Sequence, residues 1–409
     1  MRTLLLAGAA VLAICGVAWA TGYQDFNLGI SAGNRDDDDT AVQSLTRALA
    51  ESDLPQHLKA TTYVARGRVF AYRKQYDAAI ADFTAALKIR PDYPEAYANR
   101  AATFAEYHRF AEAIADDSSL IHLNPYDLDA YMARVTLYDA VGQYADAIAD
   151  CSTILNLWPK LPVELSPSPQ APIYWLRGSF HRMTGDYDKA IADDGMAIQL
   201  NDKLAAAYAD RGRARMLKGQ FEEAGVDLDQ AFEHSADDTS ARGSIVGGVD
   251  FRVHTDAGGV AWNKGFVEWD MGRFDAARAS FAQAVNLSPK NPDALLGLAI
   301  SLTKSSPSDE LARDAASADL TRWPGPILAF WLGKSSADQM RAAAEQSGDA
   351  ARKRCQANFY LGEWQLRHND LVSAHNALQA AASDCPPDVV EMEAAQVELG
   401  RALVADTNL

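Results

Sequence analysis

Small and apolar residues recur along most of this chain with the spacing of amphipathic helices, and the whole pattern repeats after 34 residues. Three prolines mark the period, at Pro91, Pro125 and Pro159, and each follows two helix-like stretches. A period of this length is typical of a pair of antiparallel helices repeated in tandem. Because one pair cannot bury its apolar face alone, consecutive pairs must stack. The pattern therefore predicts an all-α, helical-hairpin solenoid.

The repeat that begins at residue 60 shows how its two helices would pack. Small residues stand at repeat positions 8, 20 and 27, where they let the helices approach closely, and large residues stand at positions 4, 11, 17 and 24. The small residues are Gly67, Ala79 and Ala86, and the large ones are Tyr63, Phe70, Tyr76 and Phe83. We number the repeats that begin at residues 60, 94, 128, 171, 205 and 258 as repeats 1 to 6. Their pattern resembles the tetratricopeptide repeat (TPR) family, which implies a TPR-like solenoid whose surface binds partners.

Interruptions of the repeat divide the chain into segments. We expect a signal peptide at 1–20, a shortened N-terminal repeat at 21–57, TPR arrays at 58–236 and 258–322 separated by a loop insertion at 237–257, and C-terminal hairpins at 323–409. A second insertion, at 160–172, contains four prolines. The apolar spacing between Val389 and Val404 predicts a final helix that would cap the stack.

The first twenty residues have the composition of a secretory signal. Arg2 precedes an apolar run, and Ala18-Trp19-Ala20 has the small-x-small form of a signal peptidase site. Two alternatives stay open, an uncleaved N-terminal anchor and lipidation at Cys15. We therefore expect an exported, periplasmic protein, with a membrane-anchored form facing the periplasm as the alternative.

The charge and the missing motifs narrow the class of function. With 55 acidic and 38 basic residues the formal net charge is −17, so nucleic acid and anionic membranes are poor partners for the bulk surface. The chain has no HExxH, GxSxG, P-loop or Gly-rich dinucleotide motif. We therefore expect a protein that is not an enzyme, has no cofactor and no metal site, and binds a protein or peptide.

Arginine stands at position 7 and aspartate at position 23 in each of repeats 1 to 5. The arginines are Arg66, Arg100, Arg134, Arg177 and Arg211, and the aspartates are Asp82, Asp116, Asp150, Asp193 and Asp227. Because an unpaired guanidinium on the packed side of a helix is costly, we expect structural ion pairs within or between repeats. The alternative is an arginine stripe that binds an anionic ligand.

TPR solenoids present positions 2, 5, 9, 12 and 13 of the first helix of each repeat to their concave face. In repeats 1 and 2 these positions hold mostly small residues, such as Ala98, Ala102 and Ala105. From repeat 4 onward they become large, and we expect a partner-binding groove formed by Trp175, Met183, Trp262, Phe266 and Trp269. The alternative is that the loop at 235–260 or the C-terminal helix packs over these side chains.

Two cysteines flank one predicted hairpin near the C-terminus. Cys355 would begin its first helix and Cys385 would follow its second, so antiparallel packing would bring them together. In an oxidising compartment such a pair would form a disulfide, and the alternative is two independent thiols. Cys151 stands at a core position of repeat 3, where we expect a small buried hydrophobic side chain.

The C-terminal third carries a more specific resemblance. Residues 327–334, 336–340, 358–362 and the helix around Glu391 and Glu398 resemble the NlpI family of periplasmic TPR lipoproteins and related exported TPR proteins. The resemblance implies an adaptor in the cell envelope. Proteins of the NlpI family dock a tail-specific protease and peptidoglycan hydrolases, so envelope proteases or cell-wall enzymes are one class of partner to consider, but the resemblance does not identify the partner. Our hypothesis is a non-enzymatic adaptor or scaffold that binds peptides or proteins in the concave groove. The alternative is a structural or assembly component of an envelope apparatus, such as secretion or pilus machinery.

Overall fold

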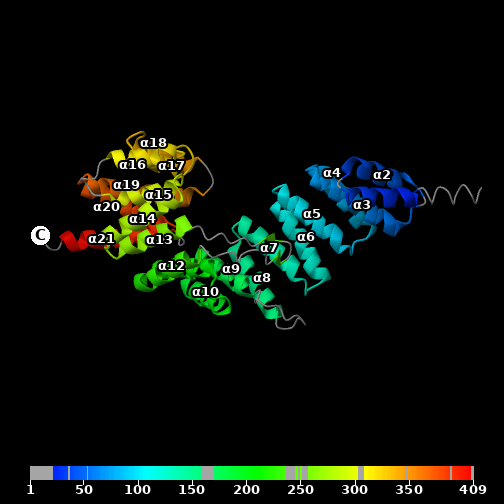
Figure 1. The fold of residues 1–409 in the computed structure, drawn as a ribbon, viewed down its shortest axis with the longest axis horizontal. Helices are drawn as coiled ribbons and strands as arrows, with labels where there is room; N and C mark the ends of the chain where they lie inside the picture. The colour runs from blue at the N-terminus through cyan, green and yellow to red at the C-terminus, as the bar shows by residue number, and fades with distance from the viewer. Residues whose placement is uncertain are drawn as a thin grey trace, which may run out of the picture. The chain divides into compact units, whose positions relative to one another are not determined.

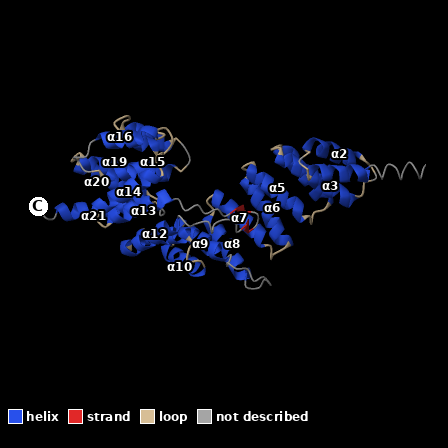
Figure 2. Cartoon of the chain, viewed as in Figure 1, coloured by secondary structure: helices blue, strands red, loops and turns tan. Residues whose placement is uncertain are grey.

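The structure is a computed structural model. It describes residues 22–35, 37–52, 54–158, 170–235, 245–246, 249–250, 257–302, 308–346, 349–386 and 389–406. The expected signal peptide and most of the proline-rich insertion lie outside these residues. The described parts are almost entirely helical (Figure 2), which confirms the all-α, TPR-like fold class. The chain forms two compact units, residues 1–150 with 246–249, and residues 151–245 with 250–409.

The first unit consists of paired helices, drawn from blue through cyan to blue-green in Figure 1. A helix at 22–33 precedes α2 (Asp38–Ala50), α3 (Gln56–Tyr72), α4 (Tyr76–Ile89), α5 (Pro94–Glu106), α6 (Phe110–Leu123), α7 (Leu128–Ala140) and the start of α8 (Tyr144–Leu157). Repeat 1 is the hairpin of α3 and α4, and repeat 2 is the hairpin of α5 and α6. Both therefore have the antiparallel packing that the 34-residue pattern predicts.

The second unit continues the repeats and then adds further hairpins. Its helices are α9 (Gln170–Met183), α10 (Tyr187–Leu200), α11 (Ala205–Met216), α12 (Phe221–Ser235), α13 (Ala257–Asp270), α14 (Phe274–Leu287), α15 (Pro292–Ser301), α16 (Ser308–Asp314), η2 (Ala315–Ser317), α17 (Gly325–Trp331), α18 (Ala337–Glu345), α19 (Ala350–Arg367), α20 (Leu371–Asp384) and α21 (Val390–Asp406). Two short strands, β1 (Ile245–Val246) and β2 (Val249–Asp250), pair within the segment for which we expected a loop.

Close helix contacts explain the glycine at position 8 of repeats 1 and 6. A Cβ atom on Gly67 would lie 2.8 Å from the ring of Phe83, at position 24 of the same repeat. A Cβ atom on Gly265 would lie 2.5 Å from the ring of Phe281 in the equivalent place. Any larger residue at position 8 would therefore force these two helices apart.

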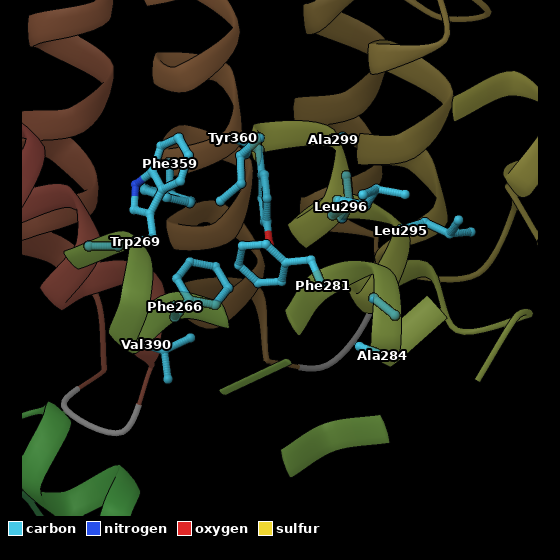
Figure 3. Close-up of a cluster of buried hydrophobic side chains, with 14 of the residues drawn as sticks. Phe266, Trp269, Phe281, Ala284, Leu295, Leu296, Ala299, Phe359, Tyr360 and Val390 are labelled. Carbon is cyan, nitrogen blue, oxygen red and sulfur yellow. The ribbon is translucent and has the colours of Figure 1, made fainter. Parts of the chain in front are cut away.

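The C-terminal hairpins close around α13. The ring of Phe266 on α13 lies 5.4 Å from that of Phe281 on α14 and 6.1 Å from that of Phe359 on α19. Figure 3 shows these rings turned toward one another, with Tyr360 beside them. Helix α21 also packs against α13, α19 and α20. This aromatic cluster is the largest described core of the second unit.

Candidate functional site

The arginine at position 7 binds two repeats at once, as repeat 3 illustrates. Arg134 donates from Nε and Nη2 to the two carboxylate oxygens of Asp150, over 2.8 and 2.7 Å. Its Nη1 donates to the hydroxyl of Ser118, 2.9 Å away in the preceding repeat. Tyr131 and Tyr138 flank the guanidinium, with ring centroids 5.7 and 5.6 Å from Cζ. The group is thus held by charge, by hydrogen bonds and by aromatic faces.

The same bidentate pair forms within each of repeats 1 to 5. The pairs are Arg66–Asp82, Arg100–Asp116, Arg134–Asp150, Arg177–Asp193 and Arg211–Asp227. The Arg134 side chain is 17% exposed and that of Asp150 is 7% exposed, so the pair is largely shielded from water. These contacts support the structural interpretation of the arginines over an anion-binding stripe.

The hydroxyl acceptor at position 25 is the part of this arrangement that the sequence reasoning missed. The acceptors for Arg66, Arg100, Arg134 and Arg177 are Thr46, Thr84, Ser118 and Ser152. In front of Arg211 the corresponding residue is Gly195, which has no hydroxyl. A Ser or Thr two residues after the core aspartates of repeats 1 to 3 was visible in the sequence and could have indicated this link between repeats.

The expected aromatic groove is wrong for two of its residues. Phe266 is 0% exposed and Trp269 is 9% exposed, so both belong to the core. Part of the reason is the alternative given above, because the C-terminal helix α21 packs against α13. Helix α19, which the sequence analysis did not consider here, also contacts α13 through the rings of Phe359 and Phe266. Sequence position identified the correct helix face but not the helices that cover it.

The other predicted groove residues are half-buried and engaged within the chain. The Nε1 of Trp175 donates to Asp210 over 2.9 Å, and the Nε1 of Trp262 donates to the backbone oxygen of Asp293 over 2.9 Å. Met183 is also half-buried. The structure therefore does not bring the five residues together as one open wall.

An open groove lies instead in the first unit, between α5, α6 and α7. Its volume is about 580 Å³. Its floor is formed by small side chains at the concave positions of repeat 2, among them Ala98, Ala102 and Ala105. Glu95 and Asp129 contribute carboxylates to the lining. The groove therefore combines a flat apolar floor with an acidic rim, a surface suited to a basic segment of a partner.

Asp117, at position 24 of repeat 2, also lines this groove. Its side chain is buried, with the residue only 3% exposed, and its Oδ2 accepts no hydrogen bond from any described residue. Burial, followed by the negative charge of Asp116, raises the pKa of Asp117 to about 7, although Arg134 acts in the opposite direction. A buried carboxylate oxygen without a hydrogen-bond donor is unusual and requires an explanation.

A smaller polar cavity of about 280 Å³ lies in the second unit, between α13, α15, α19 and α21. Arg213, Arg352, Asp293 and Glu391 all line it. Burial raises the pKa of Asp293 to about 6 and that of Glu391 to about 7. The Nε2 of Gln356 donates to Glu391 over 3.0 Å, so the chain itself already engages this carboxylate.

The cysteines form the bridge expected from their spacing, although α19 begins at Ala350 and Cys355 lies within the helix rather than at its start. Cys355 on α19 and Cys385 at the end of α20 form a disulfide, with their Cα atoms 5.1 Å apart. Cys151 is fully buried. Within the described ranges no cluster of His, Cys, Asp and Glu is arranged to hold a metal ion. Nor does any helix there have the length and apolarity to cross a membrane.

Comparison with protein families matches two stretches of the chain. Residues 67–106 match the family described as TPR repeat, and residues 264–325 match the family described as tetratricopeptide repeat. A search of curated proteins finds no match.

Solved TPR structures cover parts of the chain at low identity. A tetratricopeptide repeat protein from Parabacteroides merdae is 17% identical, covers 69% of this chain and 99% of its own, and has a TM-score of 0.43. PilW, a type IV pilus biogenesis factor, is 16% identical, covers 57% and 96%, and has a TM-score of 0.42. YrrB, described as having an unusual peptide-binding site, is 16% identical, covers 52% and 95%, and has a TM-score of 0.37.

Proposed function

We propose that this TPR-repeat protein is a non-enzymatic adaptor of the bacterial cell envelope that holds a segment of a partner protein in the groove between α5, α6 and α7. The TPR fold supports a scaffold for protein interactions in general. The observation that carries the more specific proposal is the groove of about 580 Å³ with its alanine floor and acidic rim. Ala98 and Ala102 are exposed there, which leaves room for the side chains of a partner.

The aromatic side chains first considered for binding are less suited to this role. Phe266 and Trp269 stabilise the core of the second unit, and Trp175 and Trp262 donate hydrogen bonds within the chain. Moving these side chains out of their present contacts to bind a partner would expose apolar surface to water. It would also leave the polar groups that they now engage without hydrogen-bond partners. The groove of the first unit requires no such rearrangement.

The envelope location rests on the sequence of residues 1–20 and on the resemblance of the C-terminal third to exported TPR proteins. It is tested by mass spectrometry of the protein purified from a bacterial host. A mature N-terminus at Thr21 supports export and cleavage. An intact Met1 in the cytoplasmic fraction, with no cleaved species, would contradict it.

The binding site is tested by filling the groove. Ala102→Trp places a large side chain on an exposed floor position without entering the core, and Ala115→Trp is the matched control on an exposed face of α6 outside the groove. Envelope extracts are cross-linked to each variant, and captured proteins are quantified by mass spectrometry. We expect Ala115→Trp to retain the partners of the unmodified protein and Ala102→Trp to lose them.

The identity of what is captured separates the two functional hypotheses. Proteases or cell-wall enzymes support the adaptor, and subunits of one envelope apparatus support the assembly role. If Ala102→Trp captures the same proteins with unchanged yield, the groove is not the binding site.

A further inference from the structure

Position 24 has an unusual residue in two of the repeats. In repeats 1, 5 and 6 it holds the buried apolar residues Phe83, Leu228 and Phe281, which fill the space between neighbouring helices. In repeats 2 and 4 it holds aspartate, Asp117 and Asp194. A carboxylate at a core position costs stability unless a donor or a cation compensates it. The two sites differ in the charged groups that the chain places near the carboxylate.

In repeat 4 an arginine of the chain lies near enough to act on the aspartate through its charge, although neither Asp194 oxygen accepts a hydrogen bond from the described residues. Asp194 is 0% exposed, and Arg182 at concave position 12 of the same repeat is 5% exposed. The positive charge of Arg182 acts to lower the pKa of Asp194, although burial keeps that pKa raised. Arg182 also pairs with Asp210 over 3.4 Å, and Asp210 accepts the indole hydrogen of Trp175. Arg182 thus acts on Asp194 through charge alone, and Arg182 and Trp175 both contact the neighbouring Asp210.

In repeat 2 the equivalent positions, 5 and 12, hold neither a tryptophan nor an arginine. Ala98 stands where repeat 4 has Trp175, and Ala105 stands where it has Arg182. Both alanines line the groove, and so does Asp117. Among the described residues no ion pair reaches Asp117, and the nearby Arg134 is already bonded to Asp150 and Ser118. The groove therefore has the shape and the charge that an incoming side chain like that of Arg182 would complement.

We infer that Asp117 is the specificity-determining residue of this groove and that it receives an arginine side chain from the partner protein. The inference rests on the proposed function, because it names the chemistry that the groove recognises. The guanidinium would enter between the alanines and pair with the buried carboxylate, while the acidic rim at Glu95 and Asp129 would attract the basic segment. A partner arginine would then take the place that Arg182 occupies in repeat 4.

The test begins with a phage-displayed library of random twelve-residue peptides, selected on the full-length protein at pH 8. Ala102→Trp serves for counter-selection, so that only peptides needing the groove survive. We expect the surviving peptides to share one arginine. If they share no basic residue, the inference is overturned while the groove remains a binding site. If no peptide distinguishes the protein from Ala102→Trp, the proposed function fails as well.

The best peptide is then synthesised with its arginine replaced by citrulline, which keeps the shape but not the charge, and by lysine. We expect citrulline to weaken binding at least about tenfold, and lysine to weaken it less. In Asp117→Asn the difference between arginine and citrulline should disappear. The matched control, Asp129→Asn, removes the same charge from the exposed rim and should keep the discrimination. Equal discrimination in Asp117→Asn and the unmodified protein would overturn the inference.

Discussion

At the scale of single residues, the burial of Asp117 bears both on the stability of the folded protein and on the proposed binding of a partner. The chain places a carboxylate where repeats 1, 5 and 6 have apolar side chains, and the described residues donate no hydrogen bond to its Oδ2. The folded protein therefore retains an unfavourable desolvation energy that a cationic partner would relieve. Such a residue weakens the isolated protein in order to favour one class of ligand.

The cost at Asp117 should appear as a pH dependence of stability. Its pKa is raised to about 7 in the folded state, above the unfolded value of 3.8. The folded state thus binds the proton more tightly, so the stabilisation is complete below pH 3.8 and is lost as the pH rises through 7. The charged groups around it are Asp116 on its own helix, Glu95 and Arg100 on α5, and Asp127, Asp129 and Arg134 around α7.

Asp117→Asn should remove this dependence. We expect the free energy of unfolding of the unmodified protein to fall by about 2 kcal/mol more than that of the variant between pH 5 and pH 8. Urea unfolding at both pH values, followed by circular dichroism, measures the difference. Parallel losses in the two proteins would mean that Asp117 is better solvated than its burial indicates.

The position-7 arginines provide the opposite case, a buried charge that is fully engaged. Arg134→Ala leaves the carboxylate of Asp150 and the hydroxyl of Ser118 without their donor. We therefore expect a loss of about 3 kcal/mol in the free energy of unfolding. Arg134→Lys keeps the charge but cannot form the bidentate pair, so its loss should be intermediate. A change below about 0.5 kcal/mol for Arg134→Ala would indicate a pair that behaves as if exposed.

At the scale of the helices, the hairpins of repeats 1 to 4 are each joined to the hairpin before them through a hydroxyl and a guanidinium. Gly195 interrupts this link at Arg211, and a Cβ atom added there would lie 3.8 Å from the Nη1 of that arginine. The space therefore exists for a serine to restore the hydrogen bond. Because Gly195 lacks the hydroxyl, the contribution of this hydrogen bond can be tested by introducing it at Gly195 as well as by removing it from another repeat.

We expect Gly195→Ser to stabilise the protein by about 1 kcal/mol more than Gly195→Ala, because only serine can accept from Arg211. Alanine is the control for helix propensity, which by itself favours alanine over serine. Thermal and urea unfolding of both variants measure the difference. A serine variant no more stable than the alanine variant would show that the hydroxyl link contributes little.

The hairpin of α19 and α20 has a covalent link between its ends. The disulfide joins residues separated by 30 positions, so it should stabilise the protein by about 3 kcal/mol through its effect on the unfolded chain. We expect dithiothreitol to lower the urea midpoint of the unmodified protein. The double variant Cys355→Ala/Cys385→Ala should show no response to the reductant. An equal response in both proteins would assign the effect to another cause.

How far the sequence predicts this molecule depends on how local each feature is. The hairpins, the Arg–Asp pairs and the Cys355–Cys385 bridge all join residues within one repeat, at spacings that the pattern itself reveals. The burial of Phe266 and Trp269 depends instead on α19 and α21, which come from a different part of the chain. Docking of distant helices leaves no periodic signal in the sequence. The sequence therefore could not show that the groove left open lies in the first unit and not on α13 in the second.

At the scale of the whole molecule, the two units differ in what occupies the concave positions. In the first unit alanines leave a groove open, whereas in the second unit the aromatic side chains are covered by the chain's own C-terminal helices. The net charge of −17 adds an attraction for basic partners over the whole surface. The same concave positions thus line the proposed binding groove in the first unit and contribute to the hydrophobic core in the second.

The hydroxyl-to-guanidinium link has a consequence for the history of such a chain. Repeats 2 and 3 each have the donor at position 7, and repeats 1 to 3 have the acceptor at position 25. A copy of repeat 2 or repeat 3 inserted beside its parent by gene duplication would therefore find a matching partner on both sides, and deletion of either copy would rejoin matching ends. Recombination could lengthen or shorten the array by whole repeats without a compensating mutation at the junction.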